Sequence, residues 1–179
     1  MRFLFFVLTV LSFQLQAQDM WQYMTSYEGN FKVHAPGVLT EKVQTITTEV
    51  GELEYHRFFY QSPTDDAENY IYMINYVDYP LGSLHSDSLE LVQTLFETSK
   101  EAALENVAGE LQYADQLNFY DYPAQIWRID YNEGNAVLKT KVFFVKNRFY
   151  LLQVATTKPK RMNQSINQFL DSFQLLNSF

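Results

Sequence analysis

The sequence predicts an α+β fold: a single-domain α/β/α sandwich in which about two main helices cover a central, mostly antiparallel sheet. Three observations favour this class. Alternation of apolar and polar residues with period two dominates the chain, only two segments have helical spacing, and the strand-like runs are joined by short turns. The chain contains no repeat and no linker, so we expect one domain over residues 18–179.

The N-terminus has the pattern of a cleaved leader. Arg2 supplies a positive charge, residues 3–13 are almost wholly apolar, and Ala17 is the small residue that a signal peptidase needs. The apolar run is shorter than the ~20 residues of a membrane-spanning helix. The chain has no cysteine, which excludes disulfides and a lipid-modified N-terminal cysteine. We therefore expect a signal peptide at 1–17 and an exported protein, periplasmic or secreted, with no membrane span and no lipid anchor.

The strands follow one another along the chain. Phe31, Val33 and Ala35 alternate with polar residues, and a threonine-rich run is expected to turn at Gly51-Glu52 into the next strand. The expected strands are 31–35, 43–50, 53–60, 70–77, 111–119, 125–131, 137–145 and 149–156. In the run 70–77 both alternating sets are apolar, which predicts that both faces of the sheet are covered.

Two helices are expected to provide this cover. The first is capped by Ser86 or Asp87, runs to about Asn106 and ends at Gly109, where a left-handed residue is usual. Its apolar stripe consists of Leu89, Val92, Leu95, Phe96, Ser99, Ala103 and Val107. The second helix begins after Pro159. Its stripe consists of Met162, Ile166, Phe169, Leu170 and Phe173.

Lys146-Asn147-Arg148 separates two apolar runs and is interpreted as a hairpin turn. This interpretation predicts a left-handed Asn147 and two basic side chains that project into water. With Lys139 and Lys141 nearby, the hairpin is the one locally basic spot of the chain, where an acidic partner could bind.

Composition and motifs exclude several classes of function. The formal charge is −8, or −9 without Arg2, and no basic face is apparent, so we expect no nucleic acid to bind. The three histidines, His34, His56 and His85, do not have metal-ligand spacing, and no glycine-rich phosphate loop occurs. We expect no cofactor, no metal and no enzyme activity. A site assembled from carboxylates, for example Glu52 with Glu54 or Asp121 with Asp130, stays an alternative, although solvated strand faces explain these residues more simply.

Aromatic residues are the unusual feature of the chain. All thirteen tyrosines and both tryptophans follow the predicted leader. Strand propensity alone explains many of them, but tyrosine is also favoured at interfaces, where the ring is buried and the hydroxyl stays hydrated. The candidate partner-binding residues, several of them at strand ends near turns, are Trp21, Tyr23, Tyr60, Tyr79, Tyr120 and Tyr122, together with Lys146 and Arg148.

Five short segments together resemble the PsbP-like family. They are Phe31 to Gly37, Tyr76 to Pro80, Tyr120 to Ala124, Val145 to Leu152 and Phe169 to Phe173. Their order and spacing are closest to those of exported bacterial members. The resemblance implies an α/β/α sandwich and a role in binding or assembly rather than catalysis. Ala124 departs from the pattern, since a glycine often follows the Tyr-Pro pair in that family.

The leading hypothesis is a non-enzymatic, monomeric exported domain that binds a protein partner or assists an envelope assembly. The alternative is a carrier of a lipid or another small apolar molecule, with a tyrosine-lined pocket between helix and sheet. A large closed cavity would favour the carrier, and an exposed aromatic surface would favour the partner-binding domain.

Overall fold

The computed structural model describes residues 21–177, so the predicted signal peptide at 1–17 lies outside the described residues. Ten strands, two α-helices and one 3-10 turn follow each other in the described part of the chain. In order they are β1 (Gln22–Ser26), β2 (Phe31–Ala35), β3 (Thr40–Thr48), β4 (Gly51–Gln61), β5 (Ile71–Asp78), α1 (Leu89–Val107), β6 (Glu110–Phe119), β7 (Tyr122–Tyr131), β8 (Ala136–Val145), β9 (Arg148–Thr157), η1 (Lys158–Lys160), α2 (Gln164–Asp171) and β10 (Gln174–Leu175).

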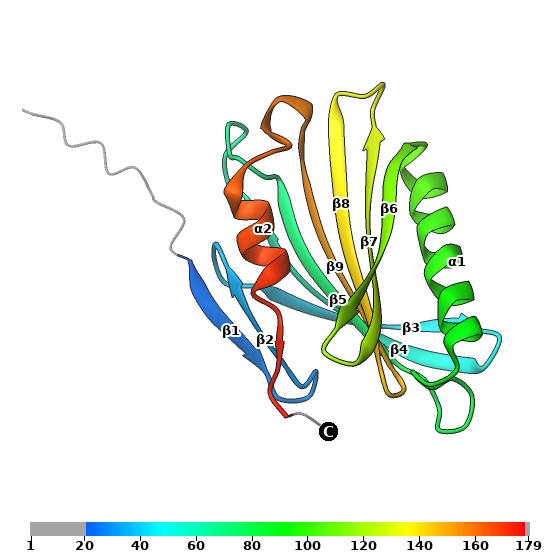
Figure 1. Cartoon of the computed structure of the whole chain (residues 1–179). Helices are drawn as coiled ribbons and strands as arrows, with labels where there is room; N and C mark the ends of the chain where they lie inside the picture. The colour runs from blue at the N-terminus through cyan, green and yellow to red at the C-terminus, as the bar shows by residue number, and fades with distance from the viewer. Residues whose placement is uncertain (1–20, 178–179) are drawn as a thin grey trace, which may run out of the picture.

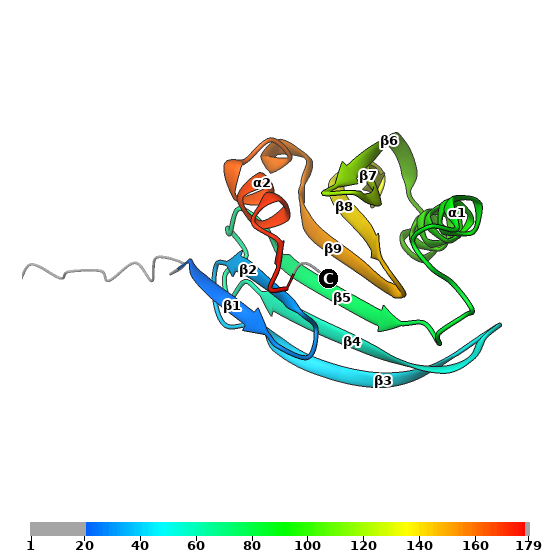
Figure 2. The ribbon, with the colours of Figure 1, turned by 60° about the horizontal axis from the view of Figure 1, so that its bottom comes forward.

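The α+β class and the antiparallel sheet are confirmed. Seven strands form one antiparallel sheet in the order β3-β4-β5-β9-β8-β7-β6, and β1, β2 and β10 form a small second sheet. Figure 1 shows the large sheet between the two helices, with α2 and the small sheet at one side and α1 at the other. Viewed from the end, the large sheet is strongly twisted and α1 and α2 lie over its opposite faces (Figure 2).

Each face of the large sheet carries its own hydrophobic core. The neighbouring residues Phe143 and Phe144 of β8 are both fully buried, Phe143 in the core beneath α2 and β2, Phe144 in the core beneath α1. Successive side chains of a strand point to opposite faces, so only a sheet covered on both sides buries both. The two apolar sets of residues 70–77 predicted this double cover, and the buried Tyr72, Ile74 and Tyr76 confirm it for the α2 face.

Both ends of α1 differ from the prediction. The N-cap is Ser88, whose side chain makes no capping hydrogen bond, rather than Ser86 or Asp87, and Leu89 is 60% exposed instead of buried. Ala108 and not Gly109 takes the left-handed conformation, with a φ of 46°. Gly109 is needed for another reason: a Cβ atom there would lie 2.4 Å from Ile129 Cγ2.

Helix α2 begins after Pro159, as predicted. Met162, however, lies before the helix and is 83% exposed. The helix starts instead at its N-cap Asn163, whose Oδ1 accepts a hydrogen bond of 3.1 Å from the Ile166 N–H. Ile166, Phe169 and Leu170 are buried as predicted.

Two turns also lie at other residues than predicted. The β3–β4 turn is formed by residues 49 and 50 and is followed by Gly51 with a φ of 112°, not by Gly51-Glu52. In the β8–β9 turn Lys146, with a φ of 55°, is left-handed rather than Asn147. The Asn147 side chain holds the turn against the end of β5, since Nδ2 donates a 2.8 Å hydrogen bond to the Tyr79 carbonyl. No helix within residues 21–177 is both long and apolar enough for a membrane span.

Candidate functional site

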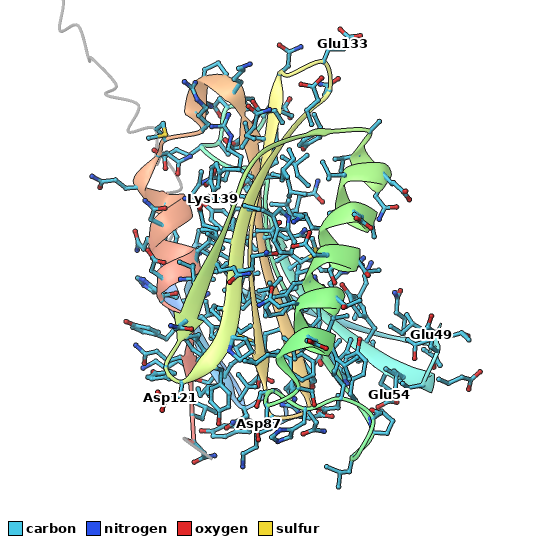
Figure 3. The ribbon with its side chains drawn as sticks, turned by 45° about the vertical axis from the view of Figure 1, so that its right-hand side comes forward. Glu49, Glu54, Asp87, Asp121, Glu133 and Lys139 are labelled. Atoms are coloured by element: carbon cyan, nitrogen blue, oxygen red, sulfur yellow. The ribbon has the colours of Figure 1, made fainter. Side chains whose placement is uncertain are left out.

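An open groove of about 1560 Å³ lies at one end of the large sheet. Its walls are the tip of the β6–β7 hairpin, the loop that leads into α1 together with the first turns of that helix, and the C-terminal segment. Its lining consists of Ser86, Asp87, Leu89, Gln93, Gln116, Leu117, Asn118, Tyr120, Asp121, Tyr122, Pro123, Leu175 and Leu176. Figure 3 shows Asp87 and Asp121 at this end of the molecule and Glu133 at the opposite end.

Tyr120 sits at the tip of the β6–β7 hairpin in a strained conformation. Its φ is 53°, a left-handed backbone that costs a tyrosine about 1 kcal/mol and that turns usually assign to Gly or Asn. The side chain is nevertheless 65% exposed. The adjacent Phe119 points inward and packs against Phe143, with ring centroids 4.2 Å apart, so the hairpin is anchored in the core beneath α2. The strained, exposed tyrosine therefore stands on a fixed support.

The opposite wall of the groove is held in place by backbone and side-chain hydrogen bonds. The Ser86 N–H donates a 2.7 Å bond to the Lys146 carbonyl, which ties the loop before α1 to the β8–β9 turn. Gln116 Nε2 donates to Gln93 Oε1 at 3.4 Å and links β6 to α1 across the groove. His85 Nδ1 lies 3.3 Å from the carboxylate of Asp87. Both walls are thus pre-formed, which lowers the entropy cost of binding a partner.

The charged residues that line the groove are all acidic. Asp87 and Asp121 are its acidic residues, and no Lys, Arg or His lines it. The exposed Leu89, Leu117 and Tyr120 supply apolar surface between these carboxylates. A ligand complementary to this lining carries positive charge together with apolar side chains.

In the part of the chain that the structure describes, the carboxylates considered as catalytic pairs lie apart or have other neighbours. Asp121, just before β7, and Asp130, near the other end of that strand, were considered as an acid–base pair from the sequence; the length of β7 separates them, so that pairing is wrong. Glu54 and Glu41 both approach His56, with Glu41 Oε1 3.2 Å from His56 Nδ1, and Glu52 is exposed. Within residues 21–177 no group of three or more His, Cys, Asp or Glu could hold a metal ion.

The predicted partner-binding residues fall into three separate places. Only Tyr120 and Tyr122 line the groove. Trp21 and Tyr23 pack on His34 at the outer edge of the small sheet, with ring centroids 5.1 and 4.7 Å from it, and Tyr60 is partly buried against the core beneath α2. The remaining three, Tyr79, Lys146 and Arg148, surround the β8–β9 turn.

Arg148 does not project into water, and the prediction that it does is wrong. Its Nε and Nη2 donate hydrogen bonds of 2.5 and 2.6 Å to the Asp78 carboxylate, and Nη1 donates to the Glu28 carbonyl at 2.7 Å. Its guanidinium lies 4.6 Å from the ring centroid of Tyr76. Burial alone would lower the pKa of the Arg148 guanidinium, but the hydrogen bonds to Asp78 and the nearby charges raise it.

The other basic residues of the hairpin are also used within the protein. Lys141 Nζ forms a 2.9 Å ion pair with Asp171, and Lys139 Nζ donates a 3.0 Å hydrogen bond to Asn167, so both tie β8 to α2. Burial lowers the pKa of Lys139 despite the nearby Asp171. The interpretation of this hairpin as a turn is confirmed, and its role as a binding spot for an acidic partner stays a prediction, with Lys139, Lys141 and Arg148 engaged by other residues of the protein.

Sequence reasoning missed most of the groove. The sequence pattern places Leu117 in a strand and Asp87 at a helix cap, and it does not predict the C-terminal strand β10. The available signal was the segment Tyr120-Asp121-Tyr122-Pro123, a tight turn built from two tyrosines without a glycine. None of the known protein families matches the chain, and no curated protein is similar to it in sequence.

Proposed function

We propose that this chain is a non-enzymatic exported domain, a PsbP-like α/β/α sandwich, that binds a protein partner in the groove between the β6–β7 hairpin and the start of α1. The observation that carries the proposal is Tyr120, which is held exposed at the cost of a left-handed backbone. Strained residues that persist in a fold cluster at functional sites, and tyrosine is enriched in the energetically dominant positions of interfaces.

The occupant is an extended segment of the partner that carries Lys or Arg next to apolar residues. Its cationic side chains pair with Asp87 and Asp121, and its apolar side chains contact Leu117 and Tyr120. The groove is open rather than enclosed, and its volume exceeds that of ordinary small-molecule sites. Both features favour a polypeptide segment over a lipid or another small apolar molecule in this groove.

Export of the mature chain is part of the proposal. It rests on the charged, apolar and small-residue pattern of residues 1–17. N-terminal sequencing of the protein from its native cell should begin near Gln18. Recovery of intact Met1 from the cytoplasm would contradict export.

Site-specific photo-crosslinking in living cells tests the proposed function. A photoreactive residue at Leu117 should yield a discrete adduct, and mass spectrometry should identify the crosslinked peptide as rich in Lys or Arg. The same residue at Glu133, at the far end of the sheet, is the control and should give no such adduct (Figure 3). An acidic crosslinked segment, equal yields from both positions or no adduct from Leu117 would refute the proposal.

A further inference from the structure

A second, smaller hollow of about 230 Å³ lies between the C-terminal half of α1 and the floor of the large sheet. Strands β4, β5, β8 and β9 contribute its floor, and residues 99–107 of α1 form its wall. The lining consists of Tyr55, Arg57, Met73, Asn75, Ser99, Ala102, Ala103, Asn106, Val107, Leu138, Leu151 and Gln153. It is separate from the groove, whose α1 residues are Leu89 and Gln93.

The hollow exists because α1 does not cover the whole face. The helix packs mainly over β7, and β3 and β4 extend beyond it (Figure 2). The side chains of the helix that line the hollow include Ser99, Ala102 and Ala103, which are too small to fill it. Part of the floor beside them is apolar, with Met73 and Leu151 partly buried. A small apolar molecule has room between this wall and this floor.

Arg57 gives the hollow a positive charge. Its Nε donates a 3.3 Å hydrogen bond to Oδ1 of Asn75, a residue that is only 2% exposed, and its guanidinium lies 5.4 Å from the ring centroid of Tyr55. Burial raises the pKa of the Tyr55 hydroxyl, which a hydrogen bond from Arg57 partly opposes. Two neighbours thus hold the guanidinium, and a guanidinium has five N–H donors, so donors remain for a ligand.

No carboxylate of the described residues neutralises this charge. The lining contains neither Asp nor Glu, and within residues 21–177 Arg57 has no ion-pair partner. The other two arginines placed in strands, Arg128 and Arg148, both have one, in Asp130 and Asp78. On a chain with a formal charge of −8, a half-buried arginine without a carboxylate stands out. A bound anion would offset the desolvation of its guanidinium.

We propose that this hollow binds small monocarboxylates with an apolar tail. The carboxylate accepts hydrogen bonds from the Arg57 guanidinium, whose planar fork matches a carboxylate in two places. The tail lies along Met73, Leu151 and Ala103. The volume is below the range of drug-sized ligands, so the acid is small. This activity is independent of the groove and adds a second kind of ligand to the domain.

NMR titration of the protein, expressed from its complete coding sequence, with octanoate tests this proposal. Saturable shifts of the backbone amides of Arg57, Asn75 and residues 99–107 are expected, without shifts at the hairpin tip around Tyr120. Octan-1-ol, which has the same tail and no charge, should bind at least about tenfold more weakly, because it cannot form a charge-assisted hydrogen bond with the guanidinium.

Substitution of the arginine completes the test. Arg57→Gln should weaken octanoate binding by about tenfold or more and leave octan-1-ol binding unchanged. Arg161→Gln, the same change at an exposed position between η1 and α2, is the matched control and should bind octanoate as the unaltered protein does. No saturable shift with octanoate, shifts confined to the groove, or unchanged octanoate affinity in Arg57→Gln would overturn the proposal. If Arg57→Gln does not fold, equal binding of octanoate and octan-1-ol to the unaltered protein overturns it as well.

Discussion

Replacement of Arg148 by serine should destabilise the protein by about 2–3 kcal/mol. The side chain joins three parts of the chain: it begins β9, pairs with Asp78 at the end of β5, and bonds to the carbonyl of Glu28 in the β1–β2 turn. Asp78 is about half exposed, so the ion pair is worth only ~0.5–1 kcal/mol. The hydrogen bond to Glu28 adds roughly 1 kcal/mol, and the contact with the Tyr76 ring a further ~0.5–1 kcal/mol.

Urea unfolding followed by tryptophan fluorescence at neutral pH measures this loss. The matched control is Arg161→Ser, which removes an exposed arginine and should change the free energy of unfolding by less than about 0.5 kcal/mol. A double-mutant cycle with Asp78→Asn should give a coupling energy of ~0.5–1 kcal/mol. An Arg148→Ser variant as stable as the control would refute the reasoning, because it would mean that the side chain lies in water.

Three further variants test the fold. Asn163→Ala removes the N-cap of α2 and two amide hydrogen bonds with Asn69, of 2.9 and 3.1 Å, and should cost about 2 kcal/mol in urea unfolding; a loss below about 0.5 kcal/mol would contradict this role. Burial raises the pKa of Tyr150 to about 12. The contribution of its neutral hydroxyl to the free energy of unfolding is therefore fully present below pH ~10, the pKa in the unfolded chain, and is lost as the pH rises through 12. Tyr150→Phe should lose about 1 kcal/mol at pH 7, with its bond to the Gly29 carbonyl, yet decline less than the parent above pH 10; parallel pH profiles would exclude Tyr150 as the cause. Gly37→Ala places a Cβ 2.3 Å from the Tyr60 ring and should lower the free energy of unfolding by about 1–3 kcal/mol, measured by thermal unfolding. An unchanged free energy of unfolding would show that the Tyr60 ring moves aside freely.

The elements were predictable where local pattern decides them. Phe143 to Val145 and Phe149 to Val154 are short apolar runs separated by three polar residues, and this pattern predicts two strands, β8 and β9, with a turn between them. The start of α1 did not follow, because Ser86, Asp87 and Ser88 are all good N-caps and their propensities do not distinguish them. Strand β10 is too short to show an alternation of apolar and polar residues. It pairs with β2, which lies near the other end of the sequence, so local pattern could not predict this pairing.

The site was less predictable than the fold, because it depends on contacts between distant segments. Asp78 and Arg148 meet only through the antiparallel register of β5 and β9, seventy residues apart in the sequence. Without that register Arg148 was interpreted as an exposed turn residue. Tyr120 was named for its residue type, but its exposure and its left-handed backbone depend on the place of the hairpin turn.

The most direct test of the account is to measure stability and partner crosslinking together in Tyr120→Asn. Asparagine tolerates the left-handed backbone, so the free energy of unfolding should rise by about 0.5–1 kcal/mol. Crosslinking from a photoreactive residue at Leu117 should at the same time fall severalfold, because the interface loses its exposed tyrosine. A binding role for Tyr120 therefore predicts a more stable protein that binds its partner less well. Undiminished crosslinking in the folded variant would contradict a binding role for Tyr120 and for the groove.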